Sequence, residues 1–334
     1  MIRKPYLIFV GDARSATLAK TAFGVRDWCP DDCTGQFRLC ADAVDLGLPH
    51  LRPLEAVSRG ARSLLIGVAP VGGRIPEVWI PALVASLEAG LDLVSGMHTR
   101  LVGIPEIADA ARRLGRRLHD VRHSDREFPI ATGRKRSGRR LLTVGTDCAL
   151  GKKYTALALT RALKAHGIAA DFRATGQTGI MIAGDGVAID AVVSDFIAGA
   201  AETLSPDAAA DHWDVIEGQG ALFHPAYAGV TLGLLHGSQP DALVLCHDPM
   251  RTTTSFFPDF PLPSLEEAMT CYLYHARRTN PGARFVGIAL NTSALEIDAA
   301  RELADSTAKR LDLPVFDPVR FGIESVVERL LSGG

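Results

Sequence analysis

The sequence has 334 residues, of which 47% are hydrophobic and 22% charged, and its formal net charge at pH 7 is −2. A chain of this length exceeds the roughly 250–300 residues that one hydrophobic core usually supports, so we expect two domains. The near-neutral charge argues against a general nucleic-acid binder or membrane-surface binder. No apolar run approaches the roughly 18–20 residues that span a bilayer.

The first third of the chain alternates between strand-like and helix-like segments. Residues 1–11 indicate a first β-strand rather than a signal peptide, because their apolar part is too short. We expect strands over 6–10, 63–68 and 91–95 and helices over 14–23, 76–89 and 105–114. This alternation predicts a parallel sheet with helices on its faces. Cys29, Cys33 and Cys40 lack metal-site spacing, and six cysteines without a paired framework favour free thiols in the cytoplasm.

The pattern breaks between residues 123 and 140, where no periodicity is found. We therefore expect a Rossmann-like domain over 1–125, a linker over 126–140 and a second domain over 141–334. The linker is basic, and we favour a solvated segment over a patch for a ligand's outer phosphate. Its basic residues are Arg134, Lys135, Arg136, Arg139 and Arg140.

From residue 141 the alternation resumes and lasts to the end of the chain. Strands are expected over 141–144, 171–174, 213–216, 242–246, 284–290 and 314–316. Helices are expected over 153–166, 191–203, 264–279, 296–311 and 324–331. The predicted fold class is therefore α/β, with two doubly wound, mostly parallel sheets, the second of them P-loop NTPase-like.

Residues 141–155, LLTVGTDCALGKKYT, predict an apolar strand, a glycine-bounded loop and a helix. Loop N–H groups, the helix N-terminus and Lys152 together form a phosphate site. Five residues separate Gly145 from Gly151, one more than the usual spacing, and Lys153 stands where a magnesium-binding hydroxyl is normal. The loop thus strongly predicts a phosphorylated ligand and only weakly magnesium–nucleotide hydrolysis. Asp147 is expected to orient Lys152 or to accept a substrate proton.

Other polar side chains follow predicted strands and should gather at the same sheet edge. Glu217, within EGQG, could hold Mg²⁺ or act as a base, or it could simply pair with Lys152 or Lys153. Gln177 and Thr178 suit a polar ligand or a plain turn, and Asp195 is a better functional candidate than Asp190 or Glu202. The remaining candidates are His224 and His247 for acid–base roles, Arg251 for a carboxylate or phosphate, and Asn291 near a nucleotide base.

The loop 145–152 resembles that of dethiobiotin synthetase, which also opens Gly-Thr-Asp and keeps the longer spacing. Nearly the whole chain resembles a bacterial family, formerly of unknown function, with an N-terminal Rossmann-like and a C-terminal P-loop domain. The segments that carry this second resemblance are 67–73, 95–98, 145–152, 176–179, 195–196, 217–220 and 287–292. Members of the family look like D-glutamate N-acetyltransferases, which often act beside an enolase-type racemase of N-acetylated amino acids.

The resemblance implies transfer of acetyl from acetyl-CoA to the amine of an acidic amino acid, D-glutamate. Coenzyme A phosphates could be anchored by the loop without metal, and Thr155 would be the relevant hydroxyl. The expected cofactor-binding residues are Gly145, Thr146, Asp147, Cys148, Gly151, Lys152, Lys153, Thr155 and Asn291. The expected catalytic residues are Glu217, His224 and Asp195, and the expected substrate-binding residues are Gln177, Thr178, His247 and Arg251.

Alternative functions differ in the ligand at the loop. One is an ATP-dependent ligase or kinase of the dethiobiotin synthetase type, with Glu217 holding Mg²⁺; otherwise we expect no metal ligand. Another is a non-catalytic nucleotide-sensing module. An oxidoreductase is the weakest option, because the turn after the first strand, residues 11–16, lacks GxGxxG. We also expect a homo-oligomer with a small-molecule amino-acid substrate and no nucleic-acid or membrane partner.

Overall fold

The computed structural model describes residues 2–16, 18–123 and 126–332. The chain forms two compact units. Unit 1 comprises Met1–Asp125 and Gly176–Ala188, and unit 2 comprises Arg126–Thr175 and Ile189–Gly334. Ser124 and Asp125, at the predicted domain boundary, lie outside the described residues.

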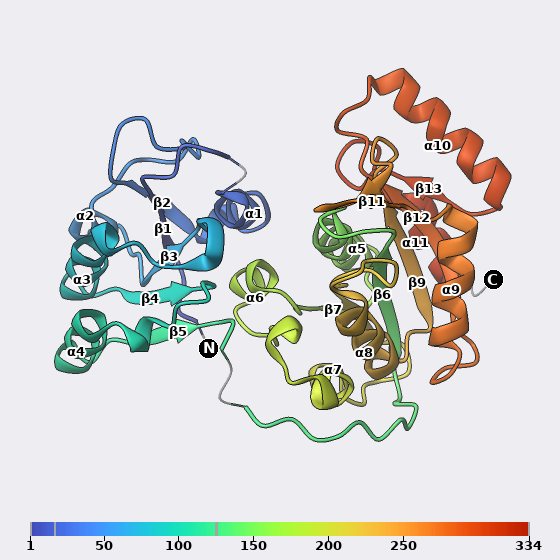
Figure 1. The fold of residues 1–334 in the computed structure, drawn as a ribbon, viewed down its shortest axis with the longest axis horizontal. Coiled ribbons are helices and arrows are strands. Elements are labelled where there is room, and N and C mark those ends of the chain that lie inside the picture. Colours follow the sequence, from blue (N-terminus) through green and yellow to red (C-terminus); the bar gives the residue numbers. More distant parts are fainter. Residues whose placement is uncertain (1, 17, 124–125, 333–334) are drawn as a thin grey trace. The chain divides into compact units, whose positions relative to one another are not determined.

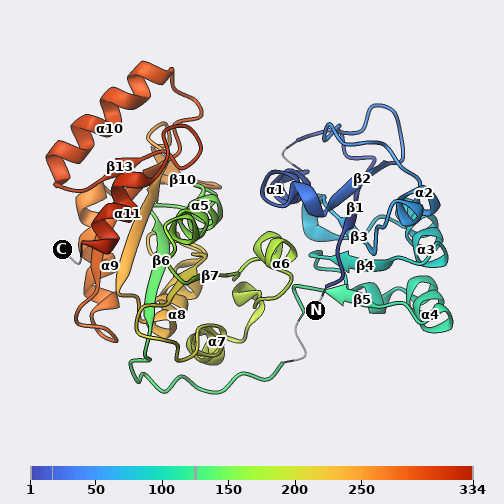
Figure 2. The same cartoon turned by 180° about the vertical axis from the view of Figure 1, so that it is seen from behind.

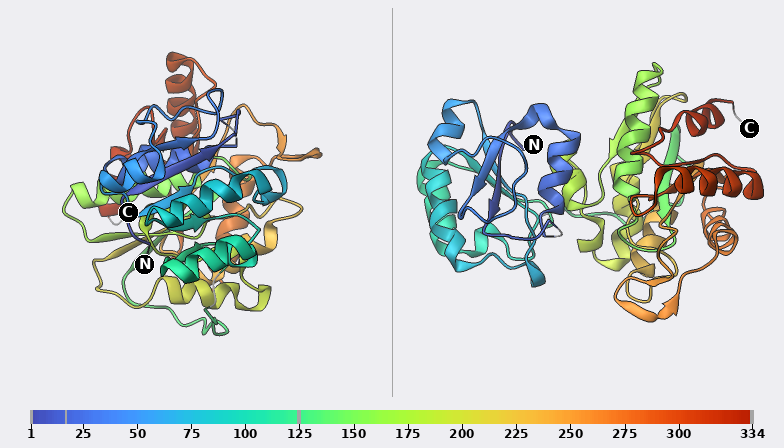
Figure 3. Two further views of the ribbon diagram at one scale, coloured as in Figure 1. Left: turned by 90° about the vertical axis from the view of Figure 1, so that its left-hand side faces the viewer. Right: turned by 90° about the horizontal axis from the view of Figure 1, so that it is seen from above.

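Unit 1 is built on a five-stranded parallel sheet with strand order β2-β1-β3-β4-β5 (Figure 1). Its strands are β1 (Tyr6–Gly11), β2 (Cys33–Arg38), β3 (Ser63–Ile66), β4 (Asp92–Ser95) and β5 (Leu118–Asp120). Helices α2 (Pro53–Ser58), α3 (Ile80–Glu88) and α4 (Pro105–Leu114) cover one face, side by side in the left view of Figure 3. Every residue of β1 is buried, as expected for a central strand between two layers of helices.

The N-terminal elements differ from the sequence prediction in four places. The helix expected over 14–23 is α1 (Lys20–Trp28), and Thr17 lies outside the described residues. Strands β2 and β5 and helix α2 were not predicted, because their short segments carry little apolar periodicity. Cys33 therefore lies at the start of a strand, and none of the six cysteines, all among the described residues, forms a disulfide.

Unit 2 contains a six-stranded parallel sheet with order β13-β12-β9-β6-β8-β7 and helices on both faces (Figure 2). Its strands are β6 (Arg139–Gly145), β7 (Ala170–Arg173), β8 (Trp213–Ile216), β9 (Ala242–His247), β12 (Arg284–Leu290) and β13 (Val315–Phe316). Its helices are α5 (Lys152–Ala165), α7 (Ile197–Leu204), α8 (Ala228–Ser238), α9 (Leu265–Ala276), α10 (Ile297–Leu311) and α11 (Glu324–Leu331). The predicted α/β class with two parallel sheets is thus confirmed.

Three features of the C-terminal half were not predicted, namely helix α8, a hairpin and helix α6. An antiparallel hairpin, β10 (Thr253–Thr254) with β11 (Phe257–Pro261), follows β9. Helix α6 (Gln177–Ala183) belongs to unit 1, although the chain enters it from β7 of unit 2. No helix among the described residues combines the length and apolar character that crossing a membrane would require.

Helix α6 is held in unit 1 by specific hydrogen bonds. The buried Tyr6 hydroxyl donates to the Met181 carbonyl at 2.9 Å, and Lys4 Nζ donates to the Ile182 carbonyl at 2.8 Å. The hydroxyls of Thr21 and Thr178 are 2.9 Å apart. Since α6 also packs on α1, unit 1 has helices on both faces of its sheet.

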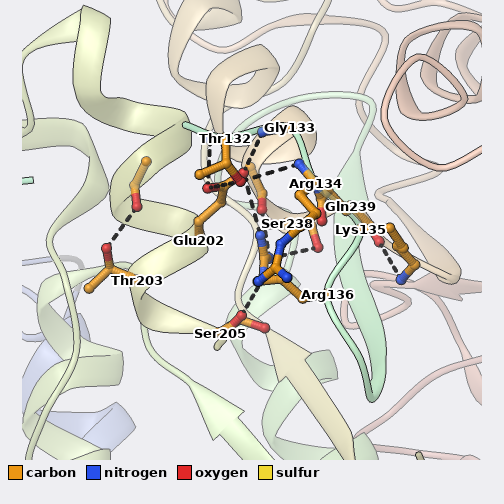
Figure 4. Close-up of polar contacts among 12 residues, drawn as sticks. Thr132, Gly133, Arg134, Lys135, Arg136, Glu202, Thr203, Ser205, Ser238 and Gln239 are labelled. Carbon is orange, nitrogen blue, oxygen red and sulfur yellow. Dashed lines mark hydrogen bonds and ion pairs between the residues drawn. The ribbon is translucent and has the colours of Figure 1, made fainter. Parts of the chain in front are cut away.

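The basic segment before β6 is only partly the solvated linker that the sequence predicts, because Arg134, Lys135 and Arg139 are exposed but two other arginines are not. Arg136 and Arg140 are buried, and Arg136 donates to the carbonyls of Ser205 and Gly237 at 2.6 and 2.8 Å (Figure 4). Burial, together with nearby Arg140, lowers the pKa of Arg136 to about 10. The segment meets the amino end of β6, whereas the phosphate loop follows the carboxyl end, so the alternative of an outer-phosphate patch is wrong.

Candidate functional site

The glycine-bounded loop connects the end of β6 at Gly145 to the start of α5 at Lys152. Two residues in it, Ala149 and Gly151, have positive φ angles of 53° and 108°, which turn the chain sharply into the helix. The Lys152 side chain folds back, and Nζ donates to the Asp147 carbonyl at 2.8 Å. Burial lowers the pKa of the Lys152 ammonium, a penalty that an anion beside it would offset. The geometry is that of a loop that can cradle phosphate.

The Asp147 side chain holds this loop in place through hydrogen bonds. Its carboxylate accepts hydrogen bonds from the Cys148 N–H at 2.7 Å and, each at 2.8 Å, from the Ser255 N–H, the Ser255 hydroxyl and an Arg251 guanidinium N–H. Burial opposes ionisation, but these donors prevail and lower the pKa of Asp147. Asp147 therefore supports the loop and presents only its backbone carbonyl to Lys152.

Arg251 lies beside the loop as a structural partner. The same guanidinium nitrogen that pairs with Asp147 also donates to the Cys148 carbonyl at 2.7 Å and to the Ser255 hydroxyl at 2.8 Å. Its expected role as a clamp for a substrate carboxylate stays a prediction, and it must compete with these three protein acceptors.

Four further residues make hydrogen bonds around the loop. The Tyr272 hydroxyl donates to the Gly145 carbonyl at 2.8 Å and accepts from the Leu222 N–H at 3.2 Å. Thr146 and His247 are joined by a 2.9 Å bond between the hydroxyl and Nδ1, and burial lowers the pKa of His247. His247 is therefore held against the loop as neutral imidazole. Thr155, in the first turn of α5, donates to the Gly151 carbonyl at 3.1 Å.

Glu217 comes directly after β8, and the backbone that follows it packs against the Lys152 side chain. The Glu217 carboxylate is buried and accepts from the Thr175 N–H at 3.0 Å, while the next N–H, of Gly218, donates to the Thr143 hydroxyl at 3.0 Å. A Cβ on Gly218 would lie 1.7 Å from the Thr143 carbonyl oxygen and 3.0 Å from Lys152 Cδ. Only glycine fits at this position, which brings the EGQG segment next to the Lys152 stem.

His224 is buried beneath the loop. Its Nδ1 accepts from the Ala226 N–H at 3.1 Å, so the proton of the neutral ring resides on Nε2. That Nε2 atom is buried, has no hydrogen-bond partner among the described residues, and lies 3.9 Å from the Asp147 carboxylate. In this arrangement His224 is a donor directed at the loop rather than a base.

Asp147, Cys148 and His224 offer ligand atoms that all lie within 4.8 Å of one another. They do not suit a metal ion, because both Asp147 oxygens already accept hydrogen bonds and Nε2 of His224 carries the proton. Burial also raises the pKa of the Cys148 thiol, which disfavours the thiolate that a metal binds.

An apolar cavity of about 250 Å³ lies at the carboxyl ends of β9 and β12. It is lined by His247, Leu265, Leu290 and Leu303, among others, and its rim carries the ion pair of Glu266 with Arg310. His247 thus contacts both the phosphate loop, through Thr146, and this cavity. Asn291 directly follows β12, and its N–H donates to the His247 carbonyl at 2.8 Å.

Three predicted site residues belong to other elements. Gln177 and Thr178 are in α6, which is part of unit 1, whereas the loop residues are part of unit 2. Asp195, expected within a helix over 191–203, is exposed in the short turn Ser194–Phe196 that leads into α7. Ser255 and Tyr272 support the loop, and Thr143 and Thr175 hold the segment at Glu217. All four escaped prediction, because single hydroxyls carry no motif.

Comparison with known proteins identifies relatives over the whole chain. A family model described as DUF1611_N Rossmann-like domain matches residues 33–124, and one described as domain of unknown function (DUF1611_C) P-loop domain matches residues 129–327. A D-glutamate N-acetyltransferase from Tritonibacter scottomollicae is 50% identical over 99% of both chains. A second one, from a Pseudoalteromonas species, is 44% identical over 98% of this chain and 99% of its own.

A solved structure shares the fold. The crystal structure of a DUF1611 family protein from Anabaena variabilis has a TM-score of 0.88 and 35% sequence identity, and covers 99% of this chain and 100% of its own. Fold and site define an α/β protein that combines a Rossmann-like unit with a P-loop unit. The chain belongs to the DUF1611 family, which confirms the resemblance found in the sequence.

Proposed function

We propose that this protein is a D-glutamate N-acetyltransferase. The observation that carries the proposal is the 50% and 44% identity, over nearly the full length, to two proteins with that activity in their names. Acetyl transfer joins the amine nitrogen to the acetyl carbonyl carbon and releases the thiol of the donor. The amine must lose a proton, and the developing oxyanion needs donors.

Acetyl-CoA is the proposed acetyl donor. The phosphate loop and the apolar cavity are linked through Thr146 and His247, an arrangement that suits a ligand with phosphates and an adenine ring. Lys152 supplies the charge, and Lys153 in place of the usual hydroxyl removes a reason to require magnesium. The acetyl group of acetyl-CoA lies at the end of a long flexible arm, so it need not sit where the phosphates do.

Within the P-loop unit, two residues are proposed to act near the chemistry. Glu217 is the candidate base, because its carboxylate follows β8 next to the segment that packs on Lys152. His224 is proposed as a donor that stabilises negative charge at the loop, since its Nδ1 already accepts a hydrogen bond. The roles expected for Asp195 and Asn291 and a homo-oligomeric state remain proposals.

The test is mass spectrometry of the products formed from acetyl-CoA and a panel of D- and L-amino acids. We expect acetylated D-glutamate as the main product. Lys152→Ala should raise the KM for acetyl-CoA about tenfold or more, because a charged contact to phosphate is lost. Lys164→Ala, on the exposed end of the same helix, is the matched control and should leave KM unchanged.

A calorimetric titration with acetyl-CoA and with ATP–Mg²⁺ separates the proposal from the ligase or kinase alternative. Tight, magnesium-dependent ATP binding with no binding of acetyl-CoA, together with no acetylated product, would refute the proposed function.

A further inference from the structure

Unit 1 contains a cavity of its own, at the carboxyl ends of β3 and β4. Its volume is about 280 Å³, near the lower end of the roughly 300–1,000 Å³ typical of small-molecule sites. The lining includes Gly73, Gly96, Met97, His98, Arg122 and Gln177. Every lining residue belongs to unit 1, and none of those described is acidic. The proposed mechanism in unit 2 uses none of them.

Close packing shows that the walls of this cavity are built by specific residues. A Cβ on Gly73, whose φ is +61°, would lie 2.3 Å from His98 Cδ2, and a Cβ on Gly96 would lie 2.1 Å from Gln177 Oε1. The His98 N–H donates to the Gly73 carbonyl at 2.9 Å. Only glycine at both positions lets the imidazole and the amide side chains lie directly on the backbone.

Gln177 reaches this wall because α6 is inserted into unit 1. The Tyr6–Met181 and Lys4–Ile182 hydrogen bonds and the Thr21–Thr178 pair hold the helix in place. Gln177, predicted to bind substrate at the sheet edge that carries the phosphate loop, thus lines a cavity of the Rossmann-like unit.

Arg122 makes the cavity suitable for an anion. It follows β5, and its Nε lies 3.3 Å from the Gly96 carbonyl, which keeps the guanidinium over the glycine wall. With an arginine, an amide and an imidazole and no carboxylate in the lining, the electrostatics favour a carboxylate ligand. The volume suits an amino acid and is too small for a whole coenzyme.

Building on the proposed function, we propose that this cavity binds a carboxylate of the acceptor amino acid, D-glutamate, with Arg122 as its charged partner and Gln177 as a positioning amide. Phosphate groups of coenzyme A are the other possible source of anionic oxygens. The experiment therefore treats acceptor and coenzyme as separate ligands.

The test is isothermal titration of the full-length protein with D-glutamate, with glutarate and with coenzyme A, the first two also in the presence of saturating coenzyme A. Arg122→Gln should weaken the binding of D-glutamate and glutarate about tenfold or more, and leave coenzyme A binding within twofold. Arg122→Lys should retain part of the affinity. Gln177→Ala is a second, independent variant that should weaken D-glutamate binding.

The matched control is Arg113→Gln, which removes the same charge from an exposed position at the end of α4 preceding β5. It should leave all three affinities unchanged. Weakened coenzyme A binding in Arg122→Gln, unchanged D-glutamate binding, or no D-glutamate binding by the wild type would each overturn the proposal. Glutarate binding does not depend on catalysis. If the wild-type protein acetylates no D-glutamate, the proposed function is refuted, but the binding of glutarate still tests the proposed carboxylate site.

Discussion

At the scale of single residues, the phosphate loop depends on one buried carboxylate. Asp147 gathers donors from Cys148, Ser255 and Arg251, which come from the loop itself and from the segment after β9. These charge-assisted bonds compensate the burial of the charge. Asp147 thus couples the shape of the loop to a hairpin about a hundred residues away.

We predict that Asp147→Asn lowers the free energy of unfolding at pH 7 by about 2 kcal/mol, because the amide loses the charge and presents N–H groups to donors. The folded-state pKa of Asp147 is lowered, so its stabilisation is complete above the unfolded pKa of about 4 and is lost as pH falls through the folded pKa. Urea unfolding at pH 7 and at pH 3 should therefore show a smaller difference between variant and wild type at pH 3.

The control for this pH dependence is Asp109→Asn, at an exposed carboxylate on α4. It should change the free energy of unfolding by less than about 0.5 kcal/mol at both pH values. A penalty for Asp147→Asn that is the same at pH 3 and pH 7 would contradict the assigned role.

At the scale of elements, α7 and α8 pack through glycine. A Cβ on Gly237 of α8 would lie 2.2 Å from the Ala198 carbonyl oxygen of α7, whereas nothing lies within 4 Å of a Cβ on Gly229 of the same helix. The Gly237 carbonyl also accepts from buried Arg136. The absence of a side chain at Gly237 therefore sets the distance between α7 and α8. It also sets the position of the segment before β6, which is bonded to Gly237 through Arg136.

We predict that Gly237→Ala lowers the free energy of unfolding by about 1–3 kcal/mol, since the helices must move apart. Gly229→Ala should instead stabilise the protein by up to about 1 kcal/mol, because alanine is the better helix former. Chemical denaturation of the two variants measures both signs. A Gly237→Ala protein as stable as the wild type would show that the α7–α8 contact is not tight.

At the scale of the whole molecule, the chain passes between the two units three times, because α6 leaves unit 2 and returns to it. Helix α6 of unit 1 is therefore joined covalently at both ends to unit 2, to β7 before it and to the turn Ile189–Ala191 after it. Local opening free energies differ among parts of a protein, and hydrogen exchange reports them segment by segment.

We predict that the amides of α6 exchange together with those of β1 when urea is raised below the unfolding midpoint, because their hydrogen bonds and packing lie in unit 1. Mass spectrometry of peptides covering 177–183, 6–11 and 152–165 makes the comparison. Exchange of α6 in step with α5, and not with β1, would contradict its assignment to unit 1.

The phosphate loop, the alternation of strands and helices and the family were accessible from the sequence. Each rests on residues close along the chain: the spacing of Gly145, Gly151 and Lys152 carries its own chemistry, and strand and helix periodicities appear within a dozen residues. Elements such as β2 and α6 were missed because their own short segments have little periodicity, and local periodicity is the signal on which the prediction depends.

The tertiary structure alone decided which distant groups meet. It paired Arg251 with Asp147, buried Arg136 against Ser205, and placed Gln177 against Gly96 within unit 1. Such pairs lie tens to more than a hundred residues apart in sequence, and no local pattern specifies them. They form because burying apolar faces brings the segments together, after which each buried polar group must find a partner.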